Sequence, residues 1–363
     1  MTPAELSRTV LRSVRGAVEE QELSVPVPAR IVVQPPPRPG CGDYASNVAL
    51  QLAGPAGRPA REVAEILQKR LAGSAGIARV EIAGPGFLNF TLGDGALIAL
   101  VRDVLAQGDG YGGTKAGPGP DAVGPVDGSA AGGARAAVVR EVLARIDAAA
   151  GPGRLRGGGH PALAPVPYDL ATLTARLGSD EVRWVLLRPA AHDPVRVPER
   201  PVQRESNPRF RVQYAHARVR ALVRNAGELG FVSEPGEVGR PLTDGSSSSS
   251  PEDRSAPTVQ PTPQQPTAAA QSLQSLQALQ TLLATFPSVI EAAARLRAPD
   301  RVVRHLEATA DAFFRWHDLF PPLPVGEQKP LAVHRARLAL AEAGGTVLAN
   351  GLRLLGISAP EHL

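Results

Sequence analysis

Two stretches of biased composition divide this chain of 363 residues and limit the size of any single hydrophobic core. The first is rich in glycine and proline and runs from Gly108 to about Pro167. The second, 232–270, holds a run of five serines followed by a proline-rich segment. Such a composition buries too little apolar surface to offset the entropy of folding, so we expect 232–270 to be disordered. The sequence therefore predicts ordered blocks over 1–112 and 167–363, with a linker over 113–166.

The first block has the pattern of a small α/β domain. Residues 3–20 carry an apolar stripe at helical spacing. Residues 78–83 and 87–92 are two short strands around a Gly-Pro-Gly turn and predict a hairpin. Further elements are expected as a strand at 30–34 and helices at 44–53, 59–71 and 96–107.

The remainder of the ordered sequence is helical. Apolar residues recur at helical spacing in six segments. They predict helices over 170–177, 180–188, 208–229, from 271 onward, 302–320 and 331–355. The linker holds one more possible helix at 134–149. The fold class we predict is a small α+β N-terminal domain joined by a Gly/Pro-rich linker to an all-α helical bundle.

Composition excludes several classes of protein. No window approaches the roughly 18 consecutive apolar residues of a membrane span. The single cysteine, Cys41, permits no internal disulfide, and seven scattered histidines form no zinc-ligand pattern. Charged residues interrupt any apolar leader near the start. We therefore expect a cytoplasmic protein without metal or cofactor.

Basic charge is concentrated in the middle of the chain. Residues 204–224 contain six arginines against the single acid Glu205. A helix of this charge attracts polyanions, and it is equally typical of a solvated arginine-rich surface. The charge pattern alone leaves both interpretations open.

Four groups of residues occur in an order that points to one family. They are 42–50 (GDYASNVAL) with 82–90 (IAGPGFLNF), then 180–188 (DEVRWVLLR), then 206–208 (SNP) with 212–218 (VQYAHAR), and finally 347–361 (VLANGLRLLGISAPE). The first group resembles the N-terminal additional domain of arginyl-tRNA synthetases. The other three resemble the helical anticodon-binding domain of that family, and the resemblance covers roughly 1–112 and 165–363.

The catalytic part of the family has no counterpart here. A class I synthetase activates its amino acid on a nucleotide-binding fold between these two blocks, and only about fifty residues stand in that place. The family's paired histidines and lysine loop, which stabilise charge on ATP phosphates, are absent. His160 and Lys115 are best explained as loop residues. We therefore expect no catalytic residues, and a pseudoenzyme.

The resemblance implies two sites that contact tRNA. In the N-terminal domain, it places Phe87 and Asn89 against the D-loop, where an aromatic ring stacks on a base and an amide contacts the base edge. Strand alternation puts both on one face of the sheet. For Phe87 a role in the core is the alternative.

In the helical domain, the resemblance assigns anticodon contacts to Tyr214 and Arg218, and Arg211 replaces the tyrosine that is usual there. Two more candidates are His317 and Leu363, the latter at the end where the family usually has methionine. Arg211, Tyr214 and Arg218 recur at spacings of three and four, which places them on one stripe of a helix. His216, one position away, is interpreted as a structural histidine.

Three functions are compatible with these patterns. The first is a tRNA-binding protein derived from an arginyl-tRNA synthetase, with no aminoacylation activity of its own and tRNA-Arg as its expected ligand. The second is an arginine–tRNA ligase that works only with a catalytic partner chain, such as a full-length synthetase. The third is a helical protein-interaction module without RNA.

Overall fold

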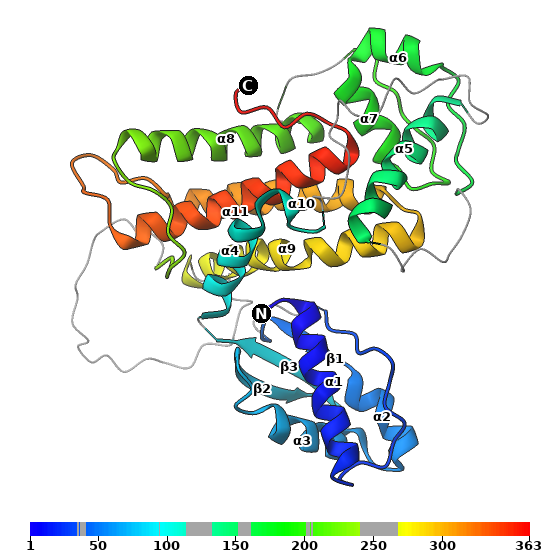
Figure 1. Ribbon diagram of the computed structural model, residues 1–363, viewed down its shortest axis with the longest axis vertical. Helices are drawn as coiled ribbons and strands as arrows, with labels where there is room; N and C mark the ends of the chain where they lie inside the picture. Colours follow the sequence, from blue (N-terminus) through cyan, green and yellow to red (C-terminus); the bar gives the residue numbers. More distant parts are fainter. Residues whose placement is uncertain are drawn as a thin grey trace, which may run out of the picture.

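The computed structural model consists of a small N-terminal unit below a larger helical bundle (Figure 1). It describes residues 1–34, 36, 41–93, 95–113, 133–151, 161–200, 204, 206–239 and 268–363. The predicted fold class, a small α+β unit followed by a helical region, is confirmed. Among the helices built from these residues, none is long and apolar enough to cross a membrane.

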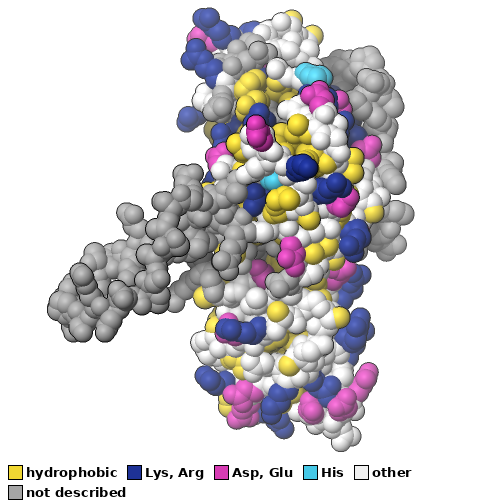
Figure 2. All heavy atoms as spheres, turned by 90° about the vertical axis from the view of Figure 1, so that its left-hand side faces the viewer, with side chains coloured by type: hydrophobic (Ala, Val, Ile, Leu, Met, Phe, Trp, Pro, Cys, Tyr) yellow, Lys and Arg dark blue, Asp and Glu magenta, His cyan; other side chains and the backbone are white. Residues whose placement is uncertain are grey.

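The N-terminal unit packs helices on one face of a three-stranded sheet. Its elements are α1 (Pro3–Glu19), β1 (Tyr44–Ser46), α2 (Val48–Ala56), α3 (Ala60–Leu71), β2 (Ile77–Ala83) and β3 (Phe87–Leu92). All pairing is antiparallel in the order β1-β3-β2, so the predicted hairpin of β2 and β3 is confirmed. Leu88 and Phe90 of the central strand are fully buried against the helices. On the face shown in Figure 2, basic and acidic side chains are interspersed over this unit, at the bottom of the view.

Two local predictions in this unit are wrong. Tyr44–Ser46, expected at the start of a helix, is strand β1, because it pairs with residues 88–90 of β3. The expected strand at 30–34 contributes only a single bridge between Gln34 and Ala45. Strand β1 ends at Ser46 and α2 begins at Val48, so residues 30–33 have no extended strand to pair with beyond this bridge.

Two helices that sequence patterns place outside the bundle lie in its core. Helix α4 (Gly95–Gln107), expected to close the N-terminal unit, buries Leu100 and Val104 in the hydrophobic cluster of the bundle. Helix α5 (Gly133–Ala150), expected as an isolated helix in the linker, buries Val142 and Ile146 in the same cluster. The short helix η1 (Gly108–Gly110) follows α4, and Asn350 donates hydrogen bonds to the carbonyls around it.

The bundle itself confirms the predicted helices. They are α6 (Leu170–Leu177), α7 (Ser179–Leu187), α8 (Pro208–Glu228), α9 (Ala268–Leu296), α10 (Asp300–Leu319) and α11 (Ala332–Leu355). Helix α8 packs on α10 and α11, and α9 packs on α10. The α8–α11 approach is close: a Cβ added to Gly345 would lie 2.7 Å from a methyl group of Val219. This packing fixes which sides of α8 and α10 face outward.

The segment predicted to be disordered is ordered at both edges. Residues 232–239 run along α11, where Glu234 N donates to the carbonyl of Arg335 and Arg337 Nε donates to the carbonyl of Val238. Residues 268–270 belong to α9. The rest of that prediction, 240–267, lies outside the described residues.

Candidate nucleic-acid interface

Three aromatic rings lie in a row between α8 and α10. Tyr214 lies 6.1 Å from Phe210 and 5.6 Å from Phe314, measured between ring centroids, with interplanar angles of 5° and 23°. These are offset-stacked geometries. Phe210 and Tyr214 are one helical turn apart on α8, whereas Phe314 comes from α10. All three are partly exposed. We call Phe210, Tyr214 and Phe314 the aromatic strip.

Arg211 is held at one edge of the aromatic strip. Its Nε donates to Oδ1 of Asp311 at 2.6 Å, and its guanidinium carbon lies 4.9 Å from the centroid of the Phe314 ring. This distance is within the range of a cation–π contact. Both side chains of the ion pair remain partly exposed, so the guanidinium stays accessible from solvent.

Arg218 and His317 complete the same region. Arg218 is exposed, and among the described residues it has no ion-pair partner. The His317 ring lies 5.7 Å from the ring of Phe313. Burial lowers the pKa of His317, and the positive charge of Arg218 lowers it further. At neutral pH the imidazole is therefore uncharged, and Arg218 supplies the positive charge there.

The C-terminal tail lies along a different side of α8. Gln213 Nε2 donates to the carbonyl of Ser358, His216 Nδ1 lies 3.0 Å from the carbonyl of Pro360, and Arg220 forms an ion pair with Glu361. Leu363, at the end of this tail, is exposed. The structure thus brings Arg211, Tyr214, Arg218 and His317 together and leaves Leu363 apart from them. His216 is buried against the tail, which agrees with a structural role.

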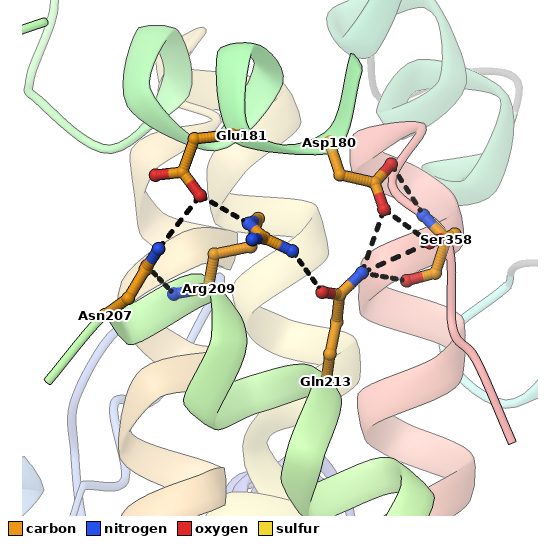
Figure 3. Close-up of polar contacts among 6 residues, drawn as sticks. All are labelled: Asp180, Glu181, Asn207, Arg209, Gln213 and Ser358. Atoms are coloured by element: carbon orange, nitrogen blue, oxygen red, sulfur yellow. Dashed lines mark hydrogen bonds and ion pairs between the residues drawn. The ribbon is translucent and has the colours of Figure 1, made fainter. Parts of the chain in front are cut away.

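A polar network fixes the start of α8 and thereby the orientation of the aromatic strip (Figure 3). The Glu181 carboxylate on α7 accepts hydrogen bonds from Arg209 Nε at 2.6 Å and Asn207 Nδ2 at 2.9 Å. Asn207 also caps α8, because its Oδ1 accepts from the backbone N–H of Arg209. The ion pair between Glu181 and Arg209 is buried.

The network continues from α8 to the C-terminal tail. Gln213 accepts from Arg209 and donates to Asp180 Oδ2, and Asp180 in turn accepts from the backbone N–H of Ser358. Three of the sequence groups that carry the family resemblance therefore meet at this point. Their role in the structure is to join α7, α8 and the tail.

The predicted pair lies on β3 in the N-terminal unit, whereas the aromatic strip lies on α8 and α10 in the bundle above it (Figure 1). Phe87 begins β3 and is 41% exposed, which argues against its role in the core. Asn89 is 9% exposed and pairs across the sheet with Ala45 and Glu81. The two occupy alternate positions of β3, on the side opposite to buried Leu88.

Side chains that could bind a metal are scattered over the described part of the chain. Within those residues no group of three or more His, Cys, Asp or Glu side chains is placed to hold a metal ion. His160 and Lys115 lie outside the described residues.

Sequence patterns missed Phe210, Phe314 and Asp311. Phe210 has a local signal, because it stands one turn before Tyr214. Asp311 and Phe314 come from a helix about 100 residues further along the chain, and nothing near Tyr214 indicates them.

Two family models match the chain. The arginyl-tRNA synthetase N-terminal domain matches residues 8–92, and the DALR anticodon binding domain matches residues 254–363. The structure is similar to the arginyl-tRNA synthetase of Thermus thermophilus over all of both chains, with a TM-score of 0.54. At 13% sequence identity this likeness concerns the fold alone.

Curated relatives agree with the family models. The chain is 38% identical to an arginine–tRNA ligase of Paenarthrobacter aurescens over 197 residues, 54% of this chain and 30% of that protein. It is 52% identical to one of Frankia alni over 112 residues, 31% of this chain and 20% of that protein. These matches thus span a third or less of either relative.

A third relative aligns over its whole length. With an arginine–tRNA ligase of Renibacterium salmoninarum, 26% identity extends over 581 positions and includes all of both chains. The 363 residues are therefore spread over a longer protein whose two ends they match. With both terminal domains present in the same order, this chain belongs to the arginyl-tRNA synthetase family and is a truncated member of it.

Proposed function

We propose that this protein binds tRNA through α8 and α10 and does not aminoacylate it on its own. The observation that carries the proposal is the aromatic strip with two arginines beside it: Arg211 lies against Phe314, and Arg218 follows Tyr214 by one helical turn on α8. Unstacked bases of RNA loops bind on aromatic faces, and arginines contact the neighbouring phosphates. The anticodon loop of a tRNA offers both groups.

The pattern of charges supports a loop of RNA as the ligand. Arg218 has no acidic partner among the described residues, so a phosphate does not have to displace one. Arg211 already pairs with Asp311, which holds its guanidinium beside the Phe314 ring. His317 is uncharged at neutral pH and offers a hydrogen-bond donor or acceptor to a base edge.

The N-terminal unit supplies the second contact of the proposal. Phe87 presents an open ring at the start of β3, and Asn89 lies two positions along the same side of the strand. Among the described residues the Asn89 amide has no hydrogen-bond partner. We assign this pair to the D-loop, with Phe87 stacking on a base and Asn89 contacting its edge.

The place of α5 supports the absence of autonomous catalysis. Of the residues between the two blocks, those of α5 are committed to the bundle core through Val138, Val142 and Ile146. A helix buried in this way contributes no strand to a nucleotide-binding sheet. This use of the segment supports a chain that has no catalytic fold of its own.

The proposal is tested by filter binding of the purified chain to tRNA-Arg at two salt concentrations. Phosphate contacts release counterions, so we expect affinity that falls steeply as salt rises. A protein-interaction module would bind tRNA weakly, with no preference over a polyanion such as heparin. That outcome would overturn the proposal.

A further inference from the structure

A cavity of about 810 Å³ opens beside the start of α8. Its walls come from α7, the segment 189–200, the first residues of α8 and the first turns of α10. Its charged lining consists of four arginines, Arg188, Arg196, Arg200 and Arg304, and three acids, Glu181, Asp193 and Glu307. Its volume lies within the range of about 300–1,000 Å³ that is typical of small-ligand pockets and leaves room for a nucleotide.

A smaller hollow of about 230 Å³ adjoins this cavity on the side of Arg211 and Asp311. Four residues line both hollows: Arg188, Ser206, Pro208 and Glu307. The smaller one is also lined by Arg211, which borders the strip. We call the two adjoining hollows together the arginine-lined groove. It extends from Arg211 to Arg200.

Two of the arginines in the groove carry charge that no described carboxylate neutralises. Arg188 pairs with Glu307 at 2.7 Å, and Arg304 pairs with Asp300. Arg196 and Arg200 are exposed and have no ion-pair partner among the described residues. The far end of the groove is therefore the part that attracts an anion.

The wall of the groove is held in place from behind by Arg135 of α5. This side chain is 2% exposed and donates hydrogen bonds of 2.8–3.1 Å to five backbone carbonyls of the segment 186–193. A buried guanidinium with so many acceptors fixes that segment in one conformation. The cavity is thus formed before any ligand enters.

We propose that the arginine-lined groove binds the phosphate backbone of the RNA nucleotides next to those stacked on the aromatic strip. The inference rests on the proposed function and extends it to a second contact surface. Guanidinium groups match phosphate oxygens in geometry and charge. Arg196 and Arg200 each contact a phosphate, whereas the paired Arg188 and Arg304 shape the walls.

The test uses the full chain and an RNA hairpin with the anticodon stem-loop of tRNA-Arg. The variant R196A/R200A removes both unpaired charges at exposed positions. We expect about tenfold weaker binding, and a slope of log affinity against log salt that is lower by about 1.4, because each single-strand phosphate contributes about 0.7.

The matched control is R8A/R12A, which removes two exposed arginines four residues apart on α1. These arginines also lack ion-pair partners among the described residues. The hairpin lacks a D-loop and has no reason to reach the N-terminal unit, so we expect a change below twofold. Thermal melting of both variants should match the parent.

Four outcomes decide between the proposals. Weaker hairpin binding and a lower salt slope only in R196A/R200A support the groove. If R196A/R200A binds like the parent while Y214A binds more weakly, the groove is overturned and the proposed function stands. If the parent binds neither the hairpin nor whole tRNA, the groove and the proposed function are both overturned. If tripolyphosphate binds as tightly as the hairpin, the site belongs to free polyphosphates and the RNA assignment is overturned.

Discussion

Arg211 on α8 and Asp311 on α10 form an ion pair with an Nε–Oδ1 distance of 2.6 Å. The pair crosses the junction of the two helices and sets the guanidinium against the Phe314 ring. Arginine at this position therefore does two things that a tyrosine does not: it joins α8 to α10 and it places a positive charge at the edge of the aromatic strip. Stacking then depends on Phe210, Tyr214 and Phe314.

Replacing Tyr214 with alanine removes the central ring of the strip. We expect tRNA binding to weaken by roughly 1–3 kcal/mol with little change in its salt dependence, because stacking releases no counterions. Filter binding at two salt concentrations measures both quantities. Y214F is the control, since it keeps the ring and should bind within threefold of the parent. Equal loss in both variants would assign the effect to the hydroxyl group and contradict stacking.

Removing Arg218 tests the exposed charge that follows Tyr214 by one helical turn on α8. R218A should lower the slope of log affinity against log salt by about the amount that a single phosphate contact contributes. Arg224 serves as the control, because it lies with the tail and its guanidinium faces the carbonyl of Glu361. Normal folding with unchanged binding in R218A would mean that this region is a solvated basic surface.

The absence of autonomous catalysis has its own assay. We expect no arginine-dependent exchange of pyrophosphate into ATP in the presence of tRNA, because α5 lies in the bundle core. A mock preparation from the same host, without the expressed chain, controls for a contaminating host enzyme. Exchange that exceeds this background and scales with the purified chain would show a complete active site.

Sequence patterns predicted the elements whose signals are local. The helix expected at 208–229 is α8, and the hairpin expected at 78–92 is β2 and β3. In each, the apolar spacing and the turn residues lie within the element itself.

The errors have a common cause, which is contact between residues far apart in the chain. Tyr44–Ser46 is a strand because β3 offers it a partner more than 40 residues later. Helices α4 and α5 joined the bundle because their apolar faces fit α9 and α11. Of the aromatic strip only Tyr214 was predicted, and Phe314 was missed for the same reason, since it belongs to another helix.

The ion pair between Glu181 and Arg209 should be essential for stability. E181A leaves a buried guanidinium without its carboxylate, and we expect a loss of about 3–5 kcal/mol in the free energy of unfolding. The control is E234A, which breaks the more exposed pair with Arg335 and should cost less than about 1 kcal/mol. Urea denaturation measures both. Similar losses in the two variants would show that the network in Figure 3 does not hold α8 in place.

Burial of His305 makes the stability of the bundle depend on pH. The ring lies 5.7 Å from the ring of Phe286, and burial lowers the pKa of His305 to about 4. The unfolded chain keeps an ordinary pKa near 6.5 and takes up a proton first, so the free energy of unfolding should fall as pH drops through that window. The expected contribution is about 1.4 kcal/mol per pH unit.

Comparing the parent with H305F isolates this contribution from those of the other histidines. Phenylalanine keeps the ring beside Phe286 and cannot be protonated, so H305F should lose less stability than the parent between pH 7 and pH 5. H192F is the control, because His192 is exposed and its replacement should leave the pH dependence unchanged. Urea denaturation at the two pH values gives the difference. If H305F and the parent lose the same free energy, His305 is not kept neutral by burial, and the tight packing of α9 on α10 around it is refuted.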